Sequence, residues 1–70
     1  MFKLIIRGKS AAEEMRFNDW VAASDCRDAC RATIRMSMPN IVGEVYDKER
    51  NAFILKCKDA YVELIISKED

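Results

Sequence analysis

Three cysteines are the most reactive side chains in this 70-residue chain. Cys26 and Cys30 lie four positions apart, a spacing that puts both on one side of a helix, and Cys57 lies in a segment typical of a strand. A structural zinc site needs four ligands, and the sequence has no histidine to complete one. We therefore expect these cysteines to pack as small apolar side chains. A thiol-based or metal sensor is the least favoured alternative.

Three arginines form a second pattern, since Arg27, Arg31 and Arg35 recur at intervals of four residues. On a helix they would form one stripe, away from Cys26 and Cys30, and we expect this stripe to face solvent. A solvated surface is the simpler interpretation. The alternative is an anion-binding edge for phosphates or an acidic protein surface, because the guanidinium fork matches both groups.

The sequence offers little else for catalysis. Without histidine, nucleophile activation of the Ser-His-Asp and Cys-His kinds is excluded. Gly8 and Gly43 are isolated from other glycines, so the sequence has no glycine-rich phosphate loop. Its carboxylates occur without metal-ligand spacing or a neighbouring nucleophile. We predict a protein that is not an enzyme, with no catalytic residues, no metal or other cofactor and no small-molecule substrate.

Composition limits the class of protein further. Lys and Arg total 12 and so do Asp and Glu, which argues against a general polyanion binder. No apolar run approaches the ~18 residues of a membrane helix, and the start lacks the apolar region of a signal peptide. An odd number of cysteines without a signal indicates a reducing compartment. We expect one complete, soluble domain over residues 1–70, located in the cytoplasm and without a membrane partner.

Hydrophobic periodicity indicates the elements that would position these groups. Alternation of apolar residues predicts strands over residues 2–9, 15–22, 41–46, 52–57 and 61–67. Residues 25–36 have the pattern of an amphipathic helix, which Ser24 or Asp25 would cap. Pro39 would end this helix, because the residue before a proline avoids helical geometry.

The stretch between the first strand and the helix allows two interpretations. Ser10 and Glu13 match a capping box, which favours a helix over residues 11–23, whereas alternation favours a strand that follows a loop over residues 10–14. We prefer the strand. The fold class is then α+β, a small single antiparallel sheet of four or five strands with one amphipathic helix on one face, in the order β-β-α-β-β-β. The alternative is β-α-β-β-β with a longer helical segment within residues 11–38.

Strand periodicity also predicts the two faces of the sheet. The core face would carry Phe2, Leu4, Ile6, Phe17, Ile41, Val45, Phe53, Leu55, Val62, Leu64 and Ile66. The helix would meet this face through Ala29, Cys30, Thr33 and Ile34. The outer face would expose a surplus of apolar and aromatic side chains, namely Ile5, Trp20, Val42, Tyr46, Ile54, Tyr61 and Ile65. Such exposed clusters usually mark an interface.

We interpret the outer face, together with the arginine stripe, as the interaction site. The predicted interaction residues are Ile5, Arg7, Arg16, Trp20, Arg27, Arg31, Arg35, Tyr46, Ile54, Tyr61 and Ile65. In the favoured interpretation they bind protein, either a second copy in a homodimer or the target of an inhibitor or adaptor, such as a phage-type inhibitor of host or defence proteins. In the alternative, Trp20, Tyr46 and Tyr61 stack on single-stranded nucleic acid. Glu44 and Glu63, expected on the same face, make protein the better partner.

Overall fold

The computed structural model describes residues 1–9, 12–38 and 40–69. In chain order its elements are β1 (Phe2–Arg7), β2 (Ala12–Phe17), α1 (Trp20–Ser37), β3 (Ile41–Asp47), β4 (Ala52–Cys57) and β5 (Tyr61–Lys68). The predicted fold class is therefore confirmed, as one helix and five antiparallel strands in a single open sheet. Ser10 and Pro39, on which part of a loop and the helix end were predicted, lie outside the described residues. Residues 12–14, predicted as the rest of that loop, instead form the first half of β2, so this part of the prediction is wrong.

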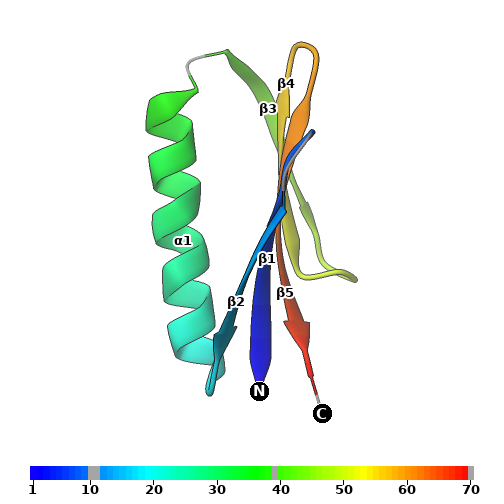
Figure 1. The fold of residues 1–70 in the computed structure, drawn as a ribbon. Helices are drawn as coiled ribbons and strands as arrows, with labels where there is room; N and C mark the ends of the chain where they lie inside the picture. Colours follow the sequence, from blue (N-terminus) through cyan, green and yellow to red (C-terminus); the bar gives the residue numbers. More distant parts are fainter. Residues whose placement is uncertain (10–11, 39, 70) are drawn as a thin grey trace.

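The sheet has the spatial order β2-β1-β5-β4-β3, and every neighbouring pair is antiparallel. The first strand lies between β2 and the last strand, so that Leu4 is opposite Met15 on one side and Ile66 on the other. The strands β2 and β3 form the two edges. Figure 1 shows α1 along one face of the twisted sheet, with no described helix against the other face.

The helix begins earlier than predicted, and the second strand is shifted accordingly. Asp19 is the N-cap, and its carboxylate accepts a hydrogen bond of 2.8 Å from the backbone N–H of Ala22. This cap starts the helix at Trp20, so the strand predicted over residues 15–22 ends at Phe17 instead. The alternative helix over residues 11–23 is also wrong for residues 12–17, because the whole of β2 pairs with β1 and packs the half-buried Met15 and Phe17 on the core.

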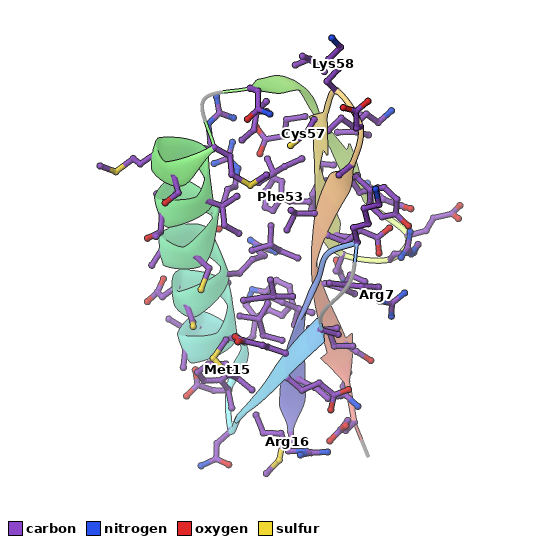
Figure 2. The ribbon with its side chains drawn as sticks, turned by 45° about the horizontal axis from the view of Figure 1, so that its top comes forward. Arg7, Met15, Arg16, Phe53, Cys57 and Lys58 are labelled. Carbon is purple, nitrogen blue, oxygen red and sulfur yellow. The ribbon has the colours of Figure 1, made fainter. Side chains whose placement is uncertain are left out.

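The helix contacts the sheet through a small core. Leu4, Ala23 and Ile66 are buried together. The partly buried apolar residues that pack on this group are Phe2, Ile6, Met15, Phe17 and Cys26. Further along the sheet, Leu55 and Leu64 are fully buried, as predicted for the core face. Figure 2 shows Met15 and Phe53 directed towards the helix and Arg7 directed away from it.

The face that the helix turns towards the sheet differs from the predicted one. Ala29 and Thr33 are exposed, whereas Ala23 and Arg27 are buried. Cys30 and Ile34, also predicted on this face, are half-buried, so the prediction holds for part of it. Ala23 takes the central contact with β1 and β5 because the helix begins early enough to include it, and Arg27 follows four positions later on the same side. In the described ranges no helix is long and apolar enough to cross a membrane.

Strand β3 contains an irregularity that reverses its predicted faces. The pairing with β4 shifts between Ile41 and Gly43, and after this bulge Glu44 is opposite Leu55 while Tyr46 is opposite Phe53. Glu44 and Tyr46 were predicted on the outer face but lie on the helix side, whereas Val45, predicted in the core, lies on the outer side. One extra residue in a strand moves every later side chain to the opposite face.

Candidate functional site

The outer face of the sheet is covered more completely than the sequence indicated. Ile5, Ile54 and Ile65 lie on it as predicted, but the first two are only partly exposed and Ile65 is buried. Glu63 is also buried here, with Arg50 Nη2 at 3.1 Å and Arg7 Nη1 at 3.9 Å from its Oε2 atom. The ion pairs of Glu63 with Arg50 and Arg7 therefore interrupt the apolar surface that was predicted.

A second ion-pair network lies at the end of this face where the chain begins. Lys3 Nζ is 2.9 Å from one oxygen of Glu69, and Arg16 Nε is 3.3 Å from the other. The hydrogen bonds of these two groups, that of Lys3 first, lower the pKa of the Glu69 carboxyl. Lys3 also lies 3.8 Å from Glu14. Arg7 and Arg16, both predicted to meet a partner, are thus engaged by carboxylates of their own chain.

The arginine stripe of the helix is not a solvated surface at its first position. The side chain of Arg27 is only 10% exposed and lies over two aromatic rings, with its Cζ atom 4.7 Å from the centre of Phe53 and 5.8 Å from that of Trp20. Its Nε donates to Asp28 at 3.2 Å, while its Nη1 is buried without a hydrogen-bond partner among the described residues. Small residues such as Ala23 cannot span the space above β4, so the long arginine fills it.

The other two arginines tie the helix to β3. Arg31 donates two hydrogen bonds to the Glu44 carboxylate, that from Nη2 measuring 2.7 Å, and its Cζ lies 4.9 Å from the centre of Phe53. Arg35 donates to the same carboxylate at 2.7 Å. The hydrogen bonds from Arg31 are the main cause of the lowered pKa of Glu44. The stripe thus holds an anion, as its residue types suggest, but this anion belongs to its own chain.

The three aromatic residues predicted to form one stacking platform lie in three separate places. Trp20 is the first residue of α1 and packs edge-on against Phe2, with ring centres 5.8 Å apart. Tyr46 lies on the helix side of β3, 4.8 Å from Phe53 between ring centres. Tyr61 alone lies on the outer face, opposite Lys56. The predicted outward positions of Trp20 and Tyr46 are therefore wrong.

The cysteines do not form one cluster with a clear chemistry. Cys26 and Cys30 line a hollow of about 360 Å³ between α1 and the β1–β2 hairpin, together with Ile6, Glu13, Ala29, Thr33 and Ile34. Burial, followed by the neighbouring Cys26, raises the pKa of the Cys30 thiol, which disfavours the thiolate form that nucleophilic chemistry requires. Cys57 lies on β4. No group of three or more potential ligands among the described residues is placed to hold a metal ion.

Strand β3 forms an edge of the sheet, which sequence reasoning did not show, although it anticipated the exposure of Val42 and Tyr46. Val42 is 73% exposed, Val45 44% and Tyr46 45%, all on a strand that has a neighbour on one side only among the described strands. On the outer face beside β3 lies a hollow of about 410 Å³, whose lining includes Ile54, Lys56, Tyr61 and Glu63. An edge strand has unpaired backbone N–H and C=O groups that can form hydrogen bonds with another strand. The apolar run from Ile41 to Tyr46 signals a strand, but only the strand order reveals that it is an edge.

We use the term β3 edge for strand β3 with its exposed side chains Val42, Val45 and Tyr46. It combines apolar side chains with backbone groups that are free to pair, and its acidic side chains have basic partners on their own chain. It is therefore the best candidate for a functional surface in the described part of the chain. Known proteins add no second indication, since neither a family model, nor a curated protein, nor a solved structure matches this chain.

Proposed function

We propose that this protein is a small, non-enzymatic module that binds another protein chain along the β3 edge. The observation that carries the proposal is the exposure of Val42, Val45 and Tyr46 on a strand with one open side. In strand addition, backbone hydrogen bonds supply affinity, and alternate side chains supply specificity. The partner is then an extended segment, either from a second copy of this chain or from a protein that the module inhibits or adapts.

The charge distribution supports a protein partner over nucleic acid. On β3, Glu44 is paired with Arg31 and Arg35, and Asp47 lies 3.9 Å from Arg50. The edge therefore presents neither a bare anion nor a free group of cations to its surroundings. Nucleic-acid binding draws its affinity from cations that neutralise phosphates, and this edge offers none that is uncommitted. A strand edge whose charges are already paired within the chain suits the backbone of another protein better.

We place this activity in a reducing compartment, with the cytoplasm as the proposed location. The support is that Cys26, Cys30 and Cys57 are all free thiols. Free thiols persist where glutathione and thioredoxin keep proteins reduced. The proposed module contributes no chemistry of its own, so its effect on a partner arises from occupying that partner's surface.

The proposal is tested by comparing two single substitutions on opposite edges of the sheet. Val45→Lys puts a charge on the outer side of β3, and Ala12→Lys puts the same charge on the exposed first residue of β2. Tagged wild type and both variants are cross-linked in extracts of the source cells, and the attached chains are identified by mass spectrometry. We expect wild type and Ala12→Lys to recover the same protein, self or other, and Val45→Lys to lose it.

Two results would overturn the proposal. One is recovery of the same partner by Val45→Lys, which would place the contact elsewhere on the molecule. The other is recovery of nucleic acid in place of protein, in an amount that falls steeply as salt is raised. Circular dichroism of both variants confirms that each is folded before the comparison is made.

A further inference from the structure

The geometry points to a second copy of this chain as the partner on the β3 edge, paired antiparallel about a two-fold axis through Val45. This inference rests on the proposed function, because it names the occupant of the same edge. The pairing would join two five-stranded sheets into one continuous sheet, with both helices on the same face. Such a contact is isologous, since the same surface is used by both copies.

The bulge in β3 fixes the centre of this pairing. Regular one-to-one pairing with β4 runs from Gly43 to Asp47, and the midpoint of that stretch is Val45. A two-fold axis perpendicular to the sheet keeps each face on its own side, so a residue can be opposite only a residue of the same face. With Val45 opposite its own copy, Gly43 is opposite Asp47, and Glu44 is opposite Tyr46.

The two neighbouring registers that keep the faces aligned are less favourable. An axis through Glu44 places two carboxylates directly opposite each other, which destabilises a strand pair. An axis through Tyr46 runs into the turn after Asp47 and shortens the pairing. The axis through Val45 puts an apolar residue at the centre. It also gives Asp47 of each copy a neighbour without a side chain, at Gly43, where a Cβ atom would meet nothing within 4 Å.

The contrast between the edges explains why the association would stop at two copies. The other edge, β2, carries Glu13, Glu14 and Arg16, and charged side chains on an edge disfavour further pairing. With one open edge per chain, pairing of β3 with β3 consumes both open edges and closes the assembly. A small core also gives the chain reason to associate, because domains of this size obtain little stability from their own interior.

A disulfide placed on the axis tests the register directly. In a background with Cys26→Ala, Cys30→Ala and Cys57→Ala, the substitution Val45→Cys puts one thiol in each copy opposite the other. Antiparallel neighbours of this kind lie within the distance that a disulfide spans. We expect Val45→Cys to form a covalent dimer on mild oxidation at least about tenfold faster than Val42→Cys or Ala12→Cys in the same background. Circular dichroism checks that this background is folded.

Light scattering and sedimentation of the unmodified chain supply an independent measurement. We expect a monomer–dimer equilibrium between about 1 μM and about 1 mM, which Val45→Lys abolishes and Ala12→Lys leaves within about twofold. Faster cross-linking at Val42 or Ala12 overturns the proposed register. A monomer at every concentration overturns self-pairing, while recovery of a different protein that Val45→Lys loses would still support the function of the edge.

Discussion

The two edge strands of the sheet, β2 and β3, expose side chains of opposite character. On β2, Glu13, Glu14 and Arg16 place charges along the outermost strand. On β3, Val42 and Val45 are exposed, and the charge of Glu44 is turned inward. Charges at an edge discourage pairing with other strands, whereas apolar side chains encourage it. The comparison shows that a single sheet has one closed and one open edge, and it locates the open one.

The arginines of α1 contact the half of the sheet that contains the open edge. Small residues face β1 and β5, where α1 lies close to the sheet, while Arg27 and Arg31 reach across to Phe53 on β4. Through Glu44, Arg31 and Arg35 also hold β3 in place. Its own helix therefore supports the open edge, and the charge of Glu44 is paired within the chain.

The largest expected effect comes from opening the second edge. The double substitution Glu14→Val/Arg16→Val gives β2 an apolar outer row like that of β3, at the cost of ion pairs to Lys3 and Glu69. With two open edges the assembly no longer closes, so we expect larger oligomers that grow with concentration. Light scattering measures this growth. Adding Val45→Lys to the double variant should stop it, and growth that persists would show that β3 takes no part.

Removing the carboxylate of Glu44, on the helix side of β3, should lower the free energy of unfolding. Glu44→Gln leaves Arg31 and Arg35 without their charged partner, and we expect a loss of about 1–2 kcal/mol in the free energy of unfolding at pH 7. Because the folded pKa of Glu44 is lowered, its contribution is present above the unfolded pKa and disappears as pH falls through the folded pKa. The difference between wild type and variant should therefore shrink on acidification from about pH 5.

Urea denaturation over a series of pH values measures both parts of this prediction. The matched control is Glu49→Gln, an exposed carboxylate in the turn between β3 and β4, which should change stability by less than about 0.5 kcal/mol. A Glu44→Gln difference that stays constant or widens at low pH would contradict the role assigned to its charge.

Loss of charge at Arg27, the buried end of the arginine stripe, should change the free energy of unfolding less than loss of charge at Glu44. Arg27→Met keeps a long side chain between Trp20 and Phe53 and removes Nη1, which is buried without a described partner. The lost cation–π contacts and the relieved desolvation oppose each other, so we expect a stability change within about 1 kcal/mol. Arg27→Ala should cost more because it leaves a cavity. Equal losses for both substitutions would show that the charge, rather than the packing, is required.

The smallest effect is expected at Gly43, on the open edge. A Cβ atom there meets nothing within 4 Å, and no glycine of the described residues has a positive φ. Gly43→Ala should therefore leave the free energy of unfolding of the monomer within about 0.5 kcal/mol or raise it slightly. Thermal unfolding in dilute solution tests this. A loss above about 1 kcal/mol would mean that the space beside the edge is not free.

Local pattern alone was enough to predict much of this fold. Alternation along β1, β4 and β5 correctly assigned Leu4, Leu55 and Leu64 to the core. The helix was found but was predicted to start too late, because the alternating pattern was extended as a strand through Trp20 and the cap was assigned to Ser24 or Asp25 rather than to Asp19. The candidate site was less accessible to prediction. Exposure of Tyr61 was anticipated on the correct face, whereas Val45 was assigned to the core.

The sequence by itself determined the order of the elements and the faces of the regular strands, because side chains three to four or two positions apart share a side of a helix or strand. Only the tertiary structure decided which strands are edges, since that depends on β5 pairing with β1 from the far end of the chain. It also decided the faces of Glu44, Val45 and Tyr46, because hydrophobic alternation does not show which residue a bulge inserts, although an isolated glycine in a strand, such as Gly43, is typical of one. The open edge, and with it the proposed partner, follows from those two long-range facts.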